Sequence, residues 1–87
     1  MRKPTRHGPV KSVVRTLAKQ IRTAREVARL TQEEAAERSL VPPKRYQAIE
    51  AGDANLTVST IARIAAAFGL SVSELTGLDV SKKRGVS

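Results

Sequence analysis

The chain has 87 residues, of which 40% are hydrophobic, and alanine is the most frequent of these. So short a chain cannot bury two cores, and its small apolar side chains favour closely packed helices over a β-rich core. It has no cysteine and a single histidine, His7. This excludes disulfides and thiolate metal sites, and we expect no metal, no cofactor and no small-molecule ligand.

Positive charge is concentrated towards the N-terminus. The formal net charge is +8, and residues 1–29 hold nine basic residues and one acid. Residues 30–81 hold four basic and seven acidic residues, and residues 82–84 are all basic. A polyanion is the natural partner for this distribution, and nucleic acid is the commonest one. We expect no membrane partner, since no apolar run approaches the length that spans a bilayer, and an anionic membrane surface stays open only as a third hypothesis.

The first eleven residues, MRKPTRHGPVK, contain two prolines, a glycine and one valine. They predict a flexible basic arm over residues 1–11, which reaches about 36 Å when extended. From Ser12, a candidate N-cap, apolar residues recur at three- and four-residue steps as far as Ala28, with Arg and Lys between them. This pattern predicts a basic amphipathic helix whose apolar side faces a core.

Two short helices are predicted next. The motif TQEE is a capping box, in which the Thr31 hydroxyl accepts from the N–H of Glu34 and the Glu34 carboxylate reaches back to Thr31. The PP pair that follows disfavours helical backbone before it, so the second short helix begins at about Pro43. That helix buries Tyr46 and Ile49 and exposes the residues between them.

Two further helices complete the predicted fold. Thr57 and Ser71 are candidate N-caps, and Gly69 and Gly77 stop the helices that they begin. No segment alternates with the period of a strand. The prediction is an all-α, compact five-helix domain over residues 12–78, followed by a short basic tail over residues 79–87.

The run TQEEAAERSLVPPKRYQAIEAGDANLTVSTIARIAAAFGLSVSEL resembles the helix-turn-helix domain of the lambda-repressor-like family, also called the Cro or xenobiotic-response-element family. Its specific parts are IRTAREVARLTQEE, the ending IEAG of the second short helix, and ANLTVSTIARIAAAFGLSVSEL. The ANLT stretch is similar to restriction-modification controller proteins. The resemblance covers residues 12–78, and it implies a DNA-binding transcription regulator whose second short helix enters the major groove.

The resemblance also implies site residues. It assigns DNA base contacts to the outer side of the second short helix: Pro43, Lys44, Arg45, Gln47 and Ala48. It assigns DNA phosphate contacts to the capping box, the first helix and the arm: Thr31, Gln32, Arg25, Arg2, Lys3 and Arg6. Arg25 and Glu50 fall where many members form a partly buried ion pair. Plainer readings stay open, with Lys44 and Arg45 as a solvated face and Gln32 as an ordinary first residue of a capped helix.

Three residues depart from the family pattern. Leu40 stands where the turn usually has glycine, so it must strain its backbone or use another geometry. Pro42 stands where a capping Ser, Thr or Asp is usual, and it offers no oxygen to the next helix. Ala48 offers a base only a methyl contact. The predicted reading helix is therefore poor in hydrogen-bonding groups.

The favoured hypothesis is a sequence-specific DNA-binding regulator, of repressor type, that binds a pseudo-palindromic operator in double-stranded DNA as a homodimer. Its predicted dimer interface consists of apolar residues at the C-terminal end: Leu70, Val72, Leu75 and Leu78. We expect it in the cytoplasm, on the nucleoid of a prokaryote or in a phage-infected cell. The second hypothesis is a protein-interaction module, such as an antitoxin or anti-repressor partner, on the same scaffold. No catalytic constellation is present, so we expect no enzyme.

Overall fold

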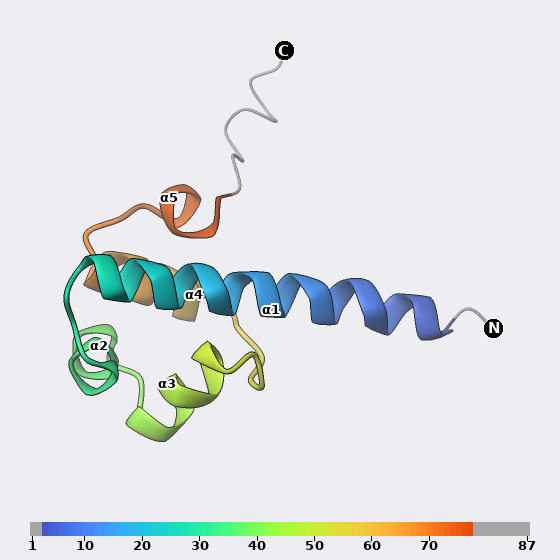
Figure 1. Cartoon of the computed structure of the whole chain (residues 1–87), viewed down its shortest axis with the longest axis horizontal. Coiled ribbons are helices and arrows are strands. Elements are labelled where there is room, and N and C mark those ends of the chain that lie inside the picture. Colours follow the sequence, from blue (N-terminus) through green and yellow to red (C-terminus); the bar gives the residue numbers. More distant parts are fainter. Residues whose placement is uncertain (1–2, 78–87) are drawn as a thin grey trace, which may run out of the picture.

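The computed structural model describes the backbone of residues 3–77 and the side chains of residues 12–77. Within this part of the chain it has five helices: α1 (Lys3–Val27), α2 (Gln32–Ser39), α3 (Pro43–Glu50), α4 (Val58–Ala67) and α5 (Val72–Thr76). No strand occurs among residues 3–77, so the all-α, five-helix prediction is confirmed. In Figure 1, α2 and α3 lie on one side of the long α1 and α5 lies on the other. Helix α4 lies behind α1.

The core forms where the five helices converge. Ala35 and Ala36 are completely buried, and their small side chains let α2 pack closely against both α3 and α4. Tyr46 of α3 is the largest side chain that is fully buried. The core cluster is Ile21, Ala35, Ala36, Val41, Tyr46, Ile49, Ile64, Ala65 and Leu75. Every helix contributes to this cluster, so α3 is fixed to the rest of the domain through its inner side.

The predicted N-caps Thr31, Thr57 and Ser71 are confirmed, whereas Ser12 is not an N-cap because it lies inside α1. Thr31 accepts from the N–H of Glu34 at 3.0 Å, and the Glu34 carboxylate accepts from the N–H of Thr31 at 2.9 Å. Ser71 forms a second capping box in the same way, and Thr57 accepts from the N–H of Thr60. Helix α3 begins after Pro42 with no side-chain cap, as its sequence requires.

The start of α1 differs from the prediction. The helix begins at Lys3, nine residues before Ser12, so the backbone of residues 3–11 is helical where a flexible arm was predicted. Pro4 lies in the first turn, where a missing N–H removes no helical hydrogen bond, and Pro9 alone interrupts the helix interior. These nine residues then span about 14 Å, much less than an extended arm. Arg2 and residues 78–87, which include Leu78 and the predicted tail, lie outside the described residues, as do the side chains of Lys3 and Arg6.

The turn between α2 and α3 carries strain at Leu40. Its φ of 59° and ψ of 42° are left-handed, and its side chain is 77% exposed. Leucine therefore adopts the geometry that glycine usually supplies there, at a cost of about 1 kcal/mol or more. We expect Leu40→Gly to raise the free energy of unfolding by about 1 kcal/mol, which is about 4 to 8 °C in the melting temperature. Thermal unfolding followed by circular dichroism measures this change.

The converse substitution is Gly69→Ala. Gly69 has a φ of 73°, and a Cβ there would meet no atom within 4 Å, so the variant isolates the cost of the left-handed backbone. We expect Gly69→Ala to lower the melting temperature by a similar amount. An unchanged or lower melting temperature for Leu40→Gly would mean that the exposed leucine contributes more through contacts than it costs in strain.

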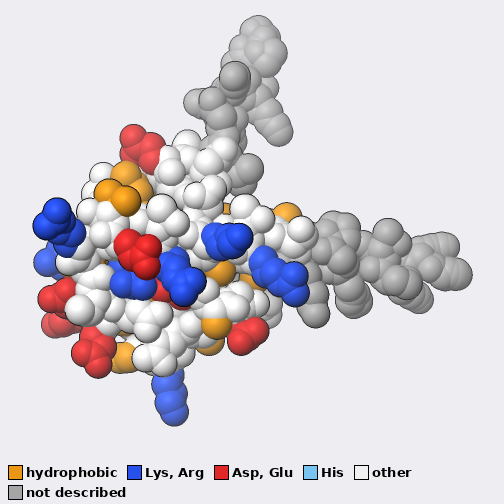
Figure 2. Space-filling view, viewed as in Figure 1, with side chains coloured by type: hydrophobic (Ala, Val, Ile, Leu, Met, Phe, Trp, Pro, Cys, Tyr) orange, Lys and Arg blue, Asp and Glu red, His pale blue; other side chains and the backbone are white. Residues whose placement is uncertain are grey.

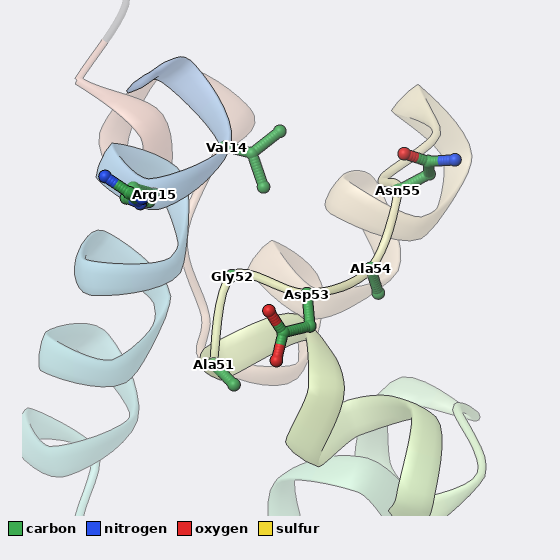
Figure 3. A pocket seen from close by; sticks show the side chains of 7 residues that line it. All are labelled: Val14, Arg15, Ala51, Gly52, Asp53, Ala54 and Asn55. Atoms are coloured by element: carbon green, nitrogen blue, oxygen red, sulfur yellow. The ribbon is translucent and has the colours of Figure 1, made fainter. Parts of the chain in front are cut away.

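Helix α1 also packs against the turn that joins α3 to α4. The Cγ atom of Arg15 lies 3.6 Å from the position that a Cβ at Gly52 would take. Beside this contact is a hollow of about 490 Å³, lined by Val14, Arg15 and residues 51–55. Figure 3 shows the Asp53 carboxylate turned towards the α1 side of the hollow. On the surface of the same region, Figure 2 shows Lys and Arg side chains gathered over α1.

Candidate nucleic-acid interface

Helix α3 divides cleanly into an inner and an outer side. Tyr46 and Ile49 are buried, because positions three apart lie on one side of a helix. The five predicted base-contact residues lie on the remaining surface, and only Ala48 among them is half-buried: Pro43, Lys44, Arg45, Gln47 and Ala48. The domain itself covers none of these positions fully, so the outer side of α3 is accessible to a partner.

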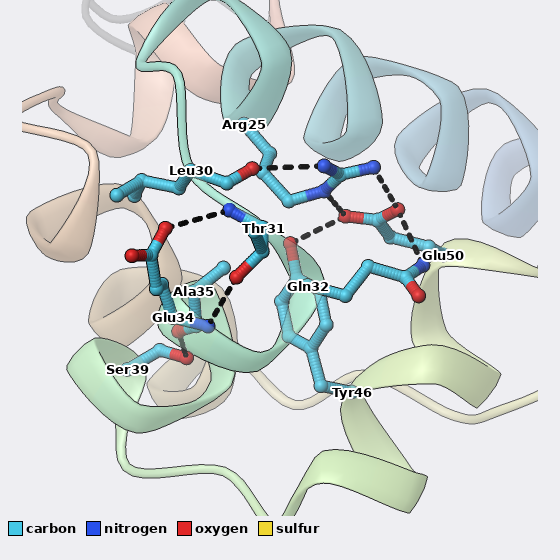
Figure 4. Close-up of polar contacts among 9 residues, drawn as sticks. All are labelled: Arg25, Leu30, Thr31, Gln32, Glu34, Ala35, Ser39, Tyr46 and Glu50. Atoms are coloured by element: carbon cyan, nitrogen blue, oxygen red, sulfur yellow. Dashed lines mark hydrogen bonds and ion pairs between the residues drawn. The ribbon is translucent and has the colours of Figure 1, made fainter.

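The inner side of α3 ends at Glu50, where three other side chains converge (Figure 4). Arg25 of α1 donates from Nε to Oε2 at 2.7 Å and from Nη2 to Oε1 at 3.1 Å. Gln32 of α2 donates from Nε2 to Oε1 at 3.0 Å, and the Tyr46 hydroxyl donates to Oε2 at 2.6 Å. We call these four residues the Glu50 hub. It joins α1, α2 and α3, including the ion pair that the resemblance implies.

The protonation states in the hub support one another. Burial opposes ionisation of Glu50, but the hydrogen bonds from Arg25, Tyr46 and Gln32 outweigh it and hold the pKa of Glu50 below its ordinary value. The hydrogen bond to Glu50 raises the pKa of Arg25, against the opposing effect of burial. Burial, followed by the bond to the carboxylate, raises the pKa of Tyr46. At neutral pH the hub therefore holds one anion, one cation and a neutral phenol.

The lowered pKa of Glu50 makes part of the stability depend on pH. Because the folded-state pKa lies below the unfolded value near 4.5, this contribution is present above about pH 4.5 and is lost as pH falls through the folded pKa. We expect the free energy of unfolding to fall on acidification, and to fall less steeply in Glu50→Gln. Urea unfolding between pH 7 and pH 3 measures both slopes. Glu37→Gln, at an exposed site, is the control, and equal slopes in all three proteins would contradict the prediction.

The start of α2 lies next to the hub. Thr31 is exposed and closes the capping box, and Gln32 is the first helical residue, so the positive end of the α2 dipole emerges beside Glu50. A helix N-terminus of this kind accommodates a phosphate. The Gln32 amide also donates to Glu50, which links α2 to the end of α3. Arg25, whose side chain is 14% exposed, donates from Nη1 to the Leu30 carbonyl at 2.9 Å and fixes the loop before the capping box.

Two hydrogen bonds that hold α2 and α3 in place were not predicted from the sequence. The bond from Tyr46 to Glu50 was missed, although the two residues are four apart on one helix and a buried phenol usually finds a partner. The second bond comes from Arg63 of α4, whose Nε donates to the carbonyl of Ser39 at 3.1 Å. This bond satisfies a carbonyl at the end of α2, just before the strained turn. No pattern in the sequence around Arg63 indicates it.

The residues predicted for the dimer interface occupy different environments. Leu75 is 2% exposed and belongs to the core of its own chain, so its side chain is not available to a second copy. Leu70 is half-buried and packs on the same core, and Val72 is 37% exposed. Within the described part of the chain, the predicted dimer interface therefore has exposed apolar surface only at Val72 and on the outer part of Leu70.

The hollow beside α1 has few side chains that could bind a ligand or act in catalysis. Its lining has one carboxylate, one guanidinium and one amide, from Asp53, Arg15 and Asn55. Among the described residues, no group of three metal-ligating side chains is close enough to hold an ion. None of the helices searched in residues 3–77 is both long and apolar enough to cross a membrane.

Comparison with known proteins identifies the domain. A family model described as helix-turn-helix matches residues 21–75, which is more than half of the chain and includes the whole hub. Neither the curated proteins nor the solved structures give a match. The matched segment contains α2, α3 and the turn between them.

Proposed function

The chain belongs to the lambda-repressor-like helix-turn-helix family of DNA-binding transcription regulators, and from this membership we propose that it binds a pseudo-palindromic operator as a homodimer. In this proposal α3 enters the major groove of double-stranded DNA, and the protein acts as a repressor on the nucleoid of a prokaryotic cell. No cofactor, metal or small-molecule ligand takes part.

The observation that carries this proposal is the division of α3. Its inner side is fixed by Tyr46, Ile49 and the Glu50 hub, while the residues of its outer side are exposed, apart from the half-buried Ala48. The major groove, about 12 Å wide, admits one such helix. Lys44 and Arg45 then lie near base edges, where arginine pairs with guanine O6 and N7, while Gln47 suits adenine and the Ala48 methyl suits thymine.

Phosphate contacts complete the proposed complex. Thr31 and Gln32, at the positive end of α2, hold one phosphate, and the Arg25 guanidinium adds a nearby charge. Because Glu50 accepts from both Arg25 and Gln32, the hub sets the distance between this phosphate and the base contacts of α3. Arg2, Lys3 and Arg6 are proposed as further phosphate contacts, and their side chains lie outside the described residues.

Selection of bound duplexes from a random pool tests the proposal. An enriched inverted repeat is expected, with half-site centres about one helical turn, or about 34 Å, apart. Sedimentation of the protein with the selected duplex is expected to give two chains per duplex. Enrichment of no sequence at either of two salt concentrations would refute the proposal.

A protein-interaction module is the second candidate. It is favoured by the start of α3, which lacks a side-chain cap, and by the exposed side chains of Leu40 and Val58, each 77% exposed. On this reading the scaffold binds a protein partner and reads DNA weakly. Stoichiometric co-purification of a protein, combined with DNA binding that shows no sequence preference, would favour this second function.

A further inference from the structure

Three basic residues form a stripe along α1. Arg15, Lys19 and Arg22 are spaced by four and three residues, which places them on one side of the helix, and all three are exposed. The stripe spans about 10 Å at 1.5 Å per residue. Along the same length of the duplex axis, one strand of DNA carries about three phosphates. Glu26, one turn beyond Arg22, ends the stripe.

The charges of the stripe have no partners within the described domain. Among residues 12–77, the only ion pair joins Arg25 to Glu50. Arg25 points inward to α3, whereas Arg15, Lys19 and Arg22 remain exposed without a carboxylate close enough to pair. Three unpaired cations at helical spacing repel one another, so the stripe favours an external anion.

The stripe runs beside the C-terminal end of α3. Arg15 and Ala18 lie beside Gly52, just after α3, within 4 Å of the position that a Cβ there would take, and Arg25 bonds Glu50 in the last turn of α3. Lys19 and Arg22 lie between these two contacts along α1. In Figure 2 the basic side chains over α1 face the viewer, and α3 lies beside α1 in the same view of Figure 1. A duplex held against α3 would therefore pass close to the stripe.

The rest of the domain, residues 30–77, lacks the positive charge that attracts DNA. Residues 30–77, which hold α2 to α5, contain four basic and six acidic residues. This part of the chain is net negative, so it repels a phosphate backbone at long range. The helix-turn-helix segment supplies shape for the groove, but it supplies little of the attraction on which DNA affinity depends.

We propose that Arg15, Lys19 and Arg22 form a DNA-backbone site that binds consecutive phosphates of one strand, next to the groove that α3 occupies. This inference rests on the proposed function, because it takes duplex DNA as the partner. It adds a DNA-binding surface outside the helix-turn-helix, and it explains how a domain whose residues 30–77 are net negative stays bound to DNA.

The test compares two variants that each lower the net charge by two. Lys19→Gln/Arg22→Gln removes two stripe cations, and Arg15 is left intact because its side chain covers Gly52. Arg38→Glu, at an exposed site on α2, is the matched control. Fluorescence anisotropy with a labelled duplex of random sequence gives Kd over a series of salt concentrations. The plot of log K against log salt should become shallower by about 1.8 in the stripe variant, since each phosphate contact contributes about 0.9. The control should keep the wild-type slope.

The outcomes separate this inference from the proposed function. If both variants keep the wild-type slope, or both slopes become equally shallow, the stripe is not a phosphate site, and operator recognition by α3 is then decided by the selection experiment alone. If the slope changes only in the stripe variant but the wild type selects no sequence, the stripe is supported and the proposed function fails. If the wild type binds no duplex at any salt concentration, both are overturned. Unfolding curves check the folding of the variants, which are changed only at exposed helical sites and are expected to stay folded.

Discussion

Glu50→Ala is expected to lower the free energy of unfolding by about 3 to 5 kcal/mol, the usual cost of breaking a buried ion pair from one side. The carboxylate, with a side chain 3% exposed, accepts from three residues on three helices. Its loss leaves the Arg25 guanidinium charged and poorly solvated, and it leaves the fully buried Tyr46 hydroxyl without its acceptor. A domain of this size has little stability to spare. Urea unfolding at pH 7 measures the loss.

Two controls make this result specific to the hub. Glu37→Ala removes an exposed carboxylate from α2 and is expected to change stability by less than about 0.5 kcal/mol. In the double variant Arg25→Ala/Glu50→Ala, no unpaired guanidinium remains, so its loss should be smaller than the sum of the two single losses. Additive losses, or a Glu50→Ala variant as stable as Glu37→Ala, would show that the hub is not a coupled unit.

The parts of this domain that sequence predicts well are those fixed by local chemistry. The capping box of Thr31 and the N-cap at Ser71 involve residues only three apart, so a single helical turn determines them. The start of α3 after Pro42 follows from proline geometry in the same way. Helical periodicity predicts that Tyr46 and Ile49 are buried. The remaining residues of α3 are thereby assigned to its outer side.

The parts that sequence reasoning missed depend on tertiary contacts or on small differences in free energy. For Leu40 the sequence left a strained backbone and another geometry open, and the structure has the strained, left-handed one, because packing of α2 against α3 restricts that turn. Leu75 is apolar like an interface residue, but packing of α5 on α1 and α4 places it in the core. The predicted start of α1 was wrong because one interior proline weakens a helix without having to end it. The bond from Arg63 to Ser39 joins residues 24 apart, beyond any local pattern.

Arg45→Ala is expected to weaken binding to the selected operator by roughly 5- to 150-fold, the equivalent of about 1 to 3 kcal/mol for a bidentate base contact. The Arg45 guanidinium lies in the first turn of α3 and is exposed. Among the described side chains, the one ion pair joins Arg25 to Glu50, so Arg45 takes part in none. Nothing inside the domain therefore competes with a base for it, and its removal should leave the fold unchanged. Titration of the selected operator and of a scrambled duplex by fluorescence anisotropy, at one salt concentration, measures the loss for each.

The comparison between the two duplexes identifies the kind of contact. A base contact is lost only on the operator, so Arg45→Ala should reduce the ratio of the two affinities, and a new selection should lose its preference at one position in each half-site. A phosphate contact would weaken both duplexes alike and leave the ratio intact. Arg38→Ala on α2 removes the same charge from a different helix and should change neither affinity by more than a small factor. Equal weakening by Arg45→Ala on both duplexes would place Arg45 on the backbone, and would leave Lys44 and Gln47 as the only side chains of α3 able to donate hydrogen bonds to bases.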